Sequence, residues 1–246
     1  MPILLLRHLV IVALLLSTAV APGARASQWI DTYNRLLAKY VTDRGVEYAA
    51  WKNNAADMQA MQEVVHAIGQ ENVSSLGKKE QLAFYPNAYN AWILHEALAK
   101  YPTKSIKDPL FTFFLIPRIQ VAGEKMSFNH LEKDIIRRQF NEPRVHFALN
   151  CASQSCPPLN KEAFRGAKLD RQLETLAVGF VNEKKGVDYV PEKNSAALSM
   201  IFNWYKDDFK PVGGALAFIN QRRKARLPND VKITYQEYDW GLNDVR

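Results

Sequence analysis

The segment Arg144-Val-His-Phe-Ala-Leu-Asn-Cys-Ala-Ser-Gln-Ser-Cys-Pro-Pro-Leu159 holds both cysteines of the chain and one of its five histidines. Residues 145–149 form a short, largely apolar segment, which predicts a buried strand. The polar residues 151–156 follow, and two prolines end the loop. The segment therefore predicts a strand that carries His146 toward a rigid loop bounded by the cysteines.

Most of the remaining sequence has the spacing of amphipathic helices. Apolar residues recur every three or four positions, and a residue that can cap a helix, Ser127, precedes one of these stretches. We expect helices over 29–40, 55–68, 128–140, 163–182, 198–209 and 215–226.

The expected strands are short. They comprise a β-hairpin over 119–126, extended segments over 110–117 and 145–149, and strands over 187–190 and 231–235. Because helices dominate, the predicted fold class is α+β: one helix-rich domain with a small antiparallel sheet.

Two asparagines lie near an expected helix start. Pro86 fits the first helical turn, where its missing N–H costs nothing. Asn87 and Asn90 are then one turn apart on one face, although asparagine is a poor helix former. Their amides either make buried hydrogen bonds with the backbone or line a cleft, in which Tyr89 is a further candidate for ligand binding.

Residues 1–26 have the pattern of a signal peptide. A basic flank at Arg7 precedes an apolar run over 9–16, and Ala24-Arg25-Ala26 is a typical cleavage pattern. The apolar run is too short for a permanent anchor. We therefore expect a periplasmic or secreted protein in which residues 27–246 form a single domain with no stable membrane anchor after cleavage.

The charge of the chain is mildly positive. It is +7 for the whole chain, and removal of Arg7 and Arg25 with the signal peptide lowers it to +5. The one basic cluster, residues 222–226, is typical of a solvated helix face. We therefore expect no nucleic-acid partner and no cofactor. The expected partner is an unknown peptide, glycan or envelope protein.

In an exported chain, two cysteines favour a disulfide. A bond between Cys151 and Cys156 closes a small ring, which locks a loop but adds little loss of entropy to the unfolded chain. Together with His146, and with His130 or His95, the cysteines also offer soft metal ligands. The spacing lacks a short cysteine pair, however, so no metal site is predicted.

The chain contains, in order, the segments LLAKYVTDRGVEYAAW, AFYPNAYNAW, LEKDIIRRQF, PRVHFALNCASQSCPPL, IFNWYKDDF and YDWGLN. Together they resemble the domain-of-unknown-function family numbered 547, from about Asp31 to Asn243. The resemblance implies an α+β domain and no defined biochemistry. The strand with the histidine is similar to that of papain-like and transglutaminase-like cysteine enzymes, a likeness of fold only. The chain departs from the family pattern at Tyr85-Pro86, in place of a pair such as Trp-Ile, and at Lys133, in place of His.

One functional hypothesis is a cysteine nucleophile. His146 would activate Cys151 or Cys156, and the amides of Asn87 or Asn90 would orient the imidazole or stabilise an oxyanion. The reaction would be hydrolysis or transfer at a peptide-like amide bond. The order of the residues opposes this hypothesis, because the nucleophile of papain-like enzymes precedes the histidine.

The alternative is a non-catalytic binding module. A Cys151–Cys156 disulfide would rigidify its loop, and Trp204 and Tyr205 would add aromatic contacts. In either case Glu132, Arg137 and Arg144 are candidate binding residues. They form either a structural ion network beside the histidine or an anion-binding or acid–base group, which requires them in the cleft of His146.

Overall fold

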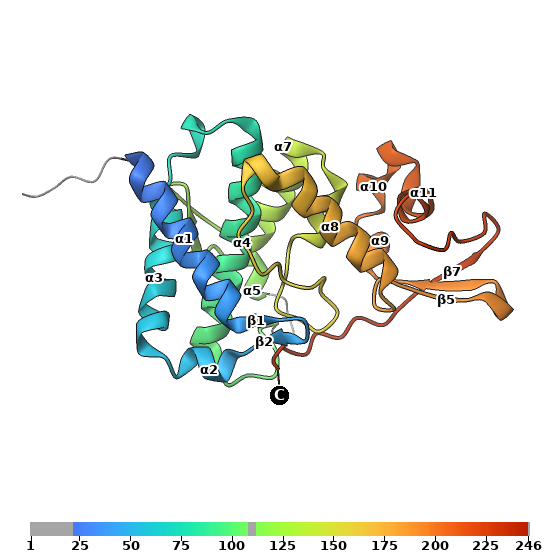
Figure 1. Ribbon diagram of the computed structural model, residues 1–246, viewed down its shortest axis with the longest axis horizontal. Coiled ribbons are helices and arrows are strands. Elements are labelled where there is room, and N and C mark those ends of the chain that lie inside the picture. Colours follow the sequence, from blue (N-terminus) through green and yellow to red (C-terminus); the bar gives the residue numbers. More distant parts are fainter. Residues whose placement is uncertain (1–21, 108–111, 246) are drawn as a thin grey trace, which may run out of the picture.

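The computed structural model describes residues 22–107 and 112–245. The N-terminal half is built from three long helices that pack side by side at one end of the molecule (Figure 1): α1 (Pro22–Tyr40), α3 (Ala55–Gln70) and α4 (Lys78–Lys100). The short strands β1 (Val41–Thr42) and β2 (Gly45–Val46), α2 (Tyr48–Lys52) and a 3-10 turn, Val73–Ser75, connect them. The helices predicted over 29–40 and 55–68 are thus confirmed. Of the predicted signal peptide, residues 1–21 lie outside the described residues, and 22–26 belong to α1.

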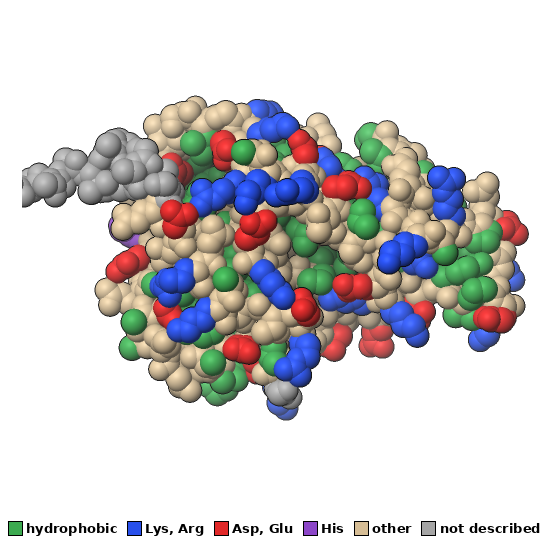
Figure 2. Space-filling view, viewed as in Figure 1, with side chains coloured by type: hydrophobic (Ala, Val, Ile, Leu, Met, Phe, Trp, Pro, Cys, Tyr) green, Lys and Arg blue, Asp and Glu red, His purple; other side chains and the backbone are tan. Residues whose placement is uncertain are grey.

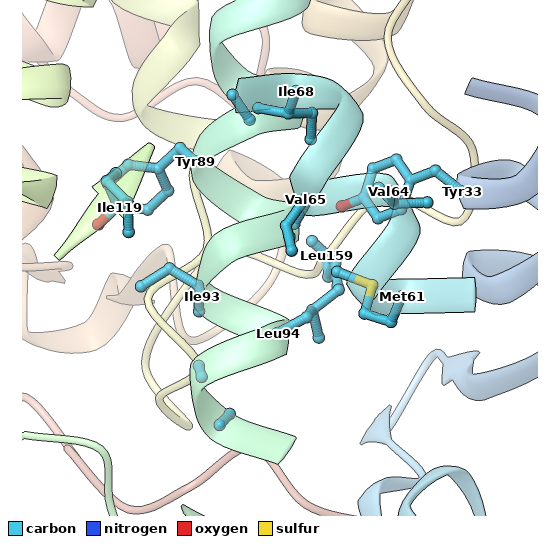
Figure 3. Close-up of a cluster of buried hydrophobic side chains, with 14 of the residues drawn as sticks. Tyr33, Met61, Val64, Val65, Ile68, Tyr89, Ile93, Leu94, Ile119 and Leu159 are labelled. Carbon is cyan, nitrogen blue, oxygen red and sulfur yellow. The ribbon is translucent and has the colours of Figure 1, made fainter. Parts of the chain in front are cut away.

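The core of this half lies between α3 and α4. Figure 3 shows Met61 and Val65 of α3 facing Leu94 of α4, while Ile93 lies on the other side of α4, toward Ile119. All five side chains are buried. Apolar residues at helical spacing therefore position α4, the helix that carries both asparagines.

The prediction that Pro86 lies in a first helical turn is wrong. Helix α4 begins eight residues earlier, at Lys78, so Pro86 lies inside it. An interior proline lacks one helical hydrogen bond and costs about 3 kcal/mol or more. Burial of the surrounding turn, including Phe84, Ala88 and Tyr89, offsets this cost.

The hairpin predicted over 119–126 is confirmed as β3 (Ile119–Val121) and β4 (Glu124–Met126), with Val121 opposite Glu124. Ala122 and Gly123 form its turn at φ 50° and 85°. Positive φ at both central residues matches the right-handed twist of the strands. Of the segment predicted as extended over 110–117, residues 110–111 lie outside the described residues, and the rest contains a short helix instead, α5 (Thr112–Leu115). Phe113 packs there against Phe128 with ring centroids 5.2 Å apart, so tertiary packing overrides the β propensity of this run.

The helix predicted over 128–140 is confirmed as a continuous helical stretch in three parts. These are α6 (Phe128–His130), a π-helical segment over Leu131–Arg137, and α7 (Arg138–Phe140). The side chain of Ser127 accepts a hydrogen bond from the N–H of His130 and caps the stretch. Asn141 ends it in a left-handed conformation at φ 50°. π-helical turns are rare and frequently mark functional sites.

The C-terminal half consists of α8 (Leu169–Asn182), short helices and a three-stranded sheet that projects at the far end (Figure 1). The strands are β5 (Val187–Val190), β6 (Ser195–Leu198) and β7 (Lys232–Tyr235). β5 and β6 are antiparallel, as expected, whereas β6 and β7 are parallel. The helices are α9 (Ile201–Trp204), α10 (Lys206–Phe209) and α11 (Gly214–Asn220). A 3-10 turn at Gly166–Lys168 precedes α8, another at Pro191–Lys193 joins β5 to β6, and a third at Lys210–Val212 joins α10 to α11.

Three expectations for this half are corrected. The helix predicted over 163–182 begins at Leu169, and the one predicted over 215–226 ends at Asn220. The segment 198–209 is not one helix, because Leu198 ends β6 and Tyr205 interrupts the helical hydrogen bonding between α9 and α10. With these corrections the α+β fold class is confirmed. Figure 2 shows Lys and Arg side chains interspersed with Asp and Glu over one face, with hydrophobic side chains gathered over the projecting sheet.

The predicted strand over 145–149 is wrong: Pro143–Phe147 forms a 3-10 helix. Pro143 fits the start of a helix, and the side chain of Glu142 accepts a hydrogen bond from the N–H of Arg144 there. Val145 packs in the N-terminal core, whereas Phe147 packs in the C-terminal one. Because this segment is buried on every side, its apolar pattern did not distinguish a strand from a helix.

Candidate functional site

The 3-10 helix Pro143–Phe147 places His146 at the junction of the two halves, with only 3% of its surface exposed. Its neighbour Phe147 is held by four phenylalanine rings with centroid distances of 5.4–6.3 Å. The backbone of the histidine is therefore fixed by packing. The comparison with papain-like enzymes rested on a histidine in a strand, and the structure does not show that strand.

The two asparagines of α4 bind the backbone of distant segments. Asn87 donates from Nδ2 to the carbonyl of Phe164 and accepts from its N–H, both at 2.8 Å. Asn90 donates to the carbonyl of Ala148 at 2.8 Å and accepts from the N–H of Asn150 at 2.9 Å. Neither side chain lines the pocket described below. Both asparagines thus make buried hydrogen bonds with the backbone, and Asn87 also lines a separate hollow beside Trp29 and Phe84.

The sulfur atoms of Cys151 and Cys156 lie at disulfide distance, and neither cysteine is a free thiol. Cys156 is buried, whereas Cys151 is partly exposed. The hydroxyl of Tyr238 lies 3.0 Å from Ser153 Oγ, 3.4 Å from Cys151 Sγ and 3.3 Å from Cys156 Sγ. The bond thus closes a small loop, and the C-terminal segment packs on it.

The disulfide and His146 lie on the wall of one pocket, with a volume of about 360 Å³. The wall is mostly apolar and rich in aromatic side chains, with a few polar groups. It consists of Tyr89, Phe114, Leu115, Asn129, Glu132, Lys133, His146, Leu149, Cys151, Cys156, Pro157, Ile201, Trp204, Tyr205, Tyr238 and Trp240. A concave, largely apolar cavity with convergent polar groups is the usual form of a small-ligand site.

A hydrogen bond holds His146 from behind the wall. Its Nε2 lies 2.8 Å from Oδ2 of Asp208, and the imidazole stacks on Tyr205 with centroids 3.9 Å apart. Arg137 binds both oxygens of Asp208, at 2.6 and 2.9 Å. Partial burial opposes ionisation of Asp208, but the hydrogen bonds from His146 and Arg137 hold its pKa well below the usual range. The orientation of the imidazole is therefore set by a carboxylate that is itself fixed.

Glu132 lies on the π-helical segment and faces the same pocket. Its Oε1 accepts a hydrogen bond of 2.6 Å from the hydroxyl of Tyr205. The aromatic side chain that packs on His146 is thus also bound to Glu132. Tyr89, Glu132 and His146, three residues selected from the sequence, share one cavity with both cysteines.

Arg144 lies outside the pocket. It binds Glu142 at 2.6 and 2.8 Å and lies 3.4 Å from Asp170 and Glu174. The hydrogen bonds with Glu142 raise the pKa of Arg144, although partial burial opposes them. The three charged residues therefore have different contacts: Glu132 lines the pocket, Arg137 fixes Asp208, and Arg144 anchors the start of the histidine segment.

Among the residues of the site that sequence reasoning missed are Asp208, Tyr238 and Trp240. The segments IFNWYKDDF and YDWGLN, which contain them, belong to the resemblance described above. The family resemblance therefore covered these residues, but no local sequence pattern assigned their side chains to the pocket.

Two further observations concern the described residues alone. No three His, Cys, Asp or Glu side chains among them lie close enough together to hold a metal ion. No helix in that part of the chain is both long and apolar enough to cross a membrane.

The fold and site define a helix-rich α+β domain with an aromatic pocket, one wall of which is a loop bounded by two paired cysteines. Residues 73–181 match the family model described as "Protein of unknown function, DUF547". The resemblance predicted from the sequence is confirmed over these residues. No curated protein and no solved structure matches the chain.

Proposed function

We propose that this protein is an exported binding module that receives a peptide-like ligand in the aromatic pocket. The observation that carries the proposal is the aromatic wall around His146, next to a cysteine pair with no free thiol. A disulfide at this place keeps the loop in one conformation, which lowers the entropy that binding has to overcome. The signal-peptide pattern of residues 1–26 and the cysteine pair both support an oxidising compartment.

The dimensions of the pocket fit one side chain or a short peptide segment. A volume of about 360 Å³ lies at the lower end of the range for ligand sites. Trp204 is 44% exposed and packs against Tyr238 with centroids 4.8 Å apart. An exposed tryptophan on a rigid support is a typical anchor for an apolar group of a ligand.

The test uses tryptophan fluorescence, because Trp204 and Trp240 line the pocket. N-acetyl-L-phenylalaninamide, a neutral peptide-like probe, is titrated to about 10 mM, which detects binding free energies down to about −3 kcal/mol. We expect a saturable change that Trp204→Ala weakens at least about tenfold. The control is Tyr235→Ala, since Tyr235 is also 44% exposed but lies on β7, outside the pocket. An equal affinity for the probe in the two variants, or no saturable fluorescence change in the wild type, would refute the proposal.

A second candidate function is thiol-dependent acyl chemistry after reduction. The observation that favours it is that both sulfurs and the His146–Asp208 pair border one cavity. A dithiol reductant would supply two electrons and two protons and release two thiols. Nδ1 of His146 would take the proton of Cys151, and the thiolate would attack an amide carbonyl. The amine would leave with that proton, and water would hydrolyse the thioester.

This candidate is tested by alkylation with iodoacetamide and intact-mass measurement. We expect no labelling before reduction and labelling of both cysteines after it. If His146 activates a thiol, Asp208→Asn lowers the labelling rate near neutral pH because it removes the carboxylate that orients the imidazole. Asp207→Asn is the control, because Asp207 is exposed and pairs with Lys210 instead. Equal rates in the two variants would exclude the thiol mechanism.

A further inference from the structure

Glu132 differs from Asp208 and Glu142, two carboxylates near His146, because it forms no ion pair with any residue that the structure describes. Asp208 is bound by Arg137 and His146, and Glu142 is bound by Arg144. Among the described residues, Glu132 forms no ion pair, and only its Oε1 accepts a hydrogen bond. The second carboxylate oxygen is therefore available to a ligand.

The surroundings of Glu132 are largely aromatic, and Arg137, whose charge interacts with Glu132, is bound to both oxygens of Asp208. Burial raises the pKa of Tyr89 and of Tyr205, and the nearby charge of Glu132 raises both further. Burial raises the pKa of Tyr238 to about 12. The hydrogen bond with Ser153 opposes this shift, and the charge of Glu132 adds to it. All three phenols therefore keep their protons at neutral pH and add no anion to the wall.

Such a wall favours a positive charge. The faces of aromatic rings attract cations, most strongly where water is displaced. A carboxylate partly shielded from water adds an attraction that is stronger than it would be at an open surface. Lys133 also borders the pocket, but its side chain is exposed, so solvent and salt screen its charge.

We infer that the ligand of this pocket presents a protonated amine to Glu132 while its apolar part lies against Trp204 and Tyr238. The chemical class is an amine joined to an aromatic or aliphatic body, such as the amino terminus or lysine side chain of a peptide. The inference rests on the proposed binding function and specifies which group of the ligand is recognised.

The experiment compares three probes of similar size: 2-phenylethylamine, 2-phenylethanol and 3-phenylpropanoate, which carry a positive, no and a negative charge at pH 7. Their affinities are measured by the same fluorescence titration at low salt. We expect the amine to bind at least about tenfold more tightly than the alcohol, a difference of about 1.4 kcal/mol. The carboxylate should bind more weakly than the alcohol.

The matched variants are Glu132→Gln, which keeps the shape of the side chain, and Glu124→Gln on exposed β4. The preference for the amine should vanish in Glu132→Gln and persist in Glu124→Gln. If the alcohol binds the wild type as tightly as the amine, the inference is wrong while the pocket remains a binding site. If N-acetyl-L-phenylalaninamide and all three probes fail to bind, both the inference and the proposed function are wrong.

Discussion

Removal of the Asn90 amide should destabilise the protein strongly, because this side chain holds the functional segment to α4. Asn90 is 2% exposed, and its two hydrogen bonds go to the backbone of Ala148 and Asn150, which are 3% and 4% exposed. In Asn90→Ala, one buried carbonyl and one buried N–H lose their partner. Each unsatisfied group costs about 1–3 kcal/mol, so we expect a loss of roughly 2–6 kcal/mol in the free energy of unfolding.

The assay is urea unfolding at neutral pH, followed by tryptophan fluorescence. The midpoint should fall while the m-value stays constant, because the same surface becomes exposed on unfolding. Asn160→Ala is the control: its amide also makes one backbone hydrogen bond, to Glu162 at 2.8 Å, but at an exposed position. The free energy of unfolding of the control should lie within about 0.5 kcal/mol of that of the wild type. A loss below about 1 kcal/mol in Asn90→Ala would show that its amide does not hold the segment.

Three further predictions concern stability. Phe147→Ala should cost about 3–5 kcal/mol, because Phe147 is fully buried among four phenylalanine rings; a thermal midpoint close to that of the wild type would contradict this. The double variant Cys151→Ser/Cys156→Ser should lose roughly 2 kcal/mol, which reductant should reproduce in the wild type but not in the variant. Asp57→Asn should lose about 2 kcal/mol at pH 7. Burial opposes ionisation of Asp57, but Lys39, Arg35 and Tyr40 hold its pKa well below the usual range. This stabilisation is complete above the unfolded pKa of about 3.9 and is lost as pH falls below it, so the wild type and Asp57→Asn should converge in stability in urea titrations between about pH 5 and pH 2.

The elements that the sequence predicted well depend on local chemistry. The β3–β4 hairpin follows from Ala122-Gly123 between two apolar strands, and the helical stretch after Ser127 follows from a side-chain cap. In both cases the residues that determine the structure lie within four positions of each other. A single sequence is sufficient for such elements.

The elements that were wrong depend on distant contacts. Residues 145–149 are apolar because two cores meet there. A fully buried segment lacks the regular spacing of polar and apolar residues that distinguishes a helix from a strand. Pro86 was placed at a helix start because local energetics favour that position. Burial of the surrounding turn against the rest of the domain outweighed this preference.

The site shows the same division between local and distant information. The segment around His146 was identified because it combines cysteines, a histidine and prolines within sixteen residues. Its partner Asp208 lies 62 residues later, and Tyr238 lies 87 residues after Cys151. No spacing rule connects positions so far apart, because α8 and at least two strands of the three-stranded sheet lie between them in the chain.

The aromatic wall of the pocket depends on how the C-terminal segment returns to the N-terminal half. Leu242 donates its backbone N–H to the carbonyl of Lys104, and Val46 donates to the carbonyl of Asn243. The hydroxyl of Tyr48 also donates to the side chain of Asn243, 195 residues away. Because these bonds fix residues 242–243 against the first half, Tyr238 and Trp240 have to cross the disulfide loop. The pocket is therefore a property of the complete domain, and its ligand specificity depends on backbone contacts at a distance from the pocket as well as on the side chains that line it.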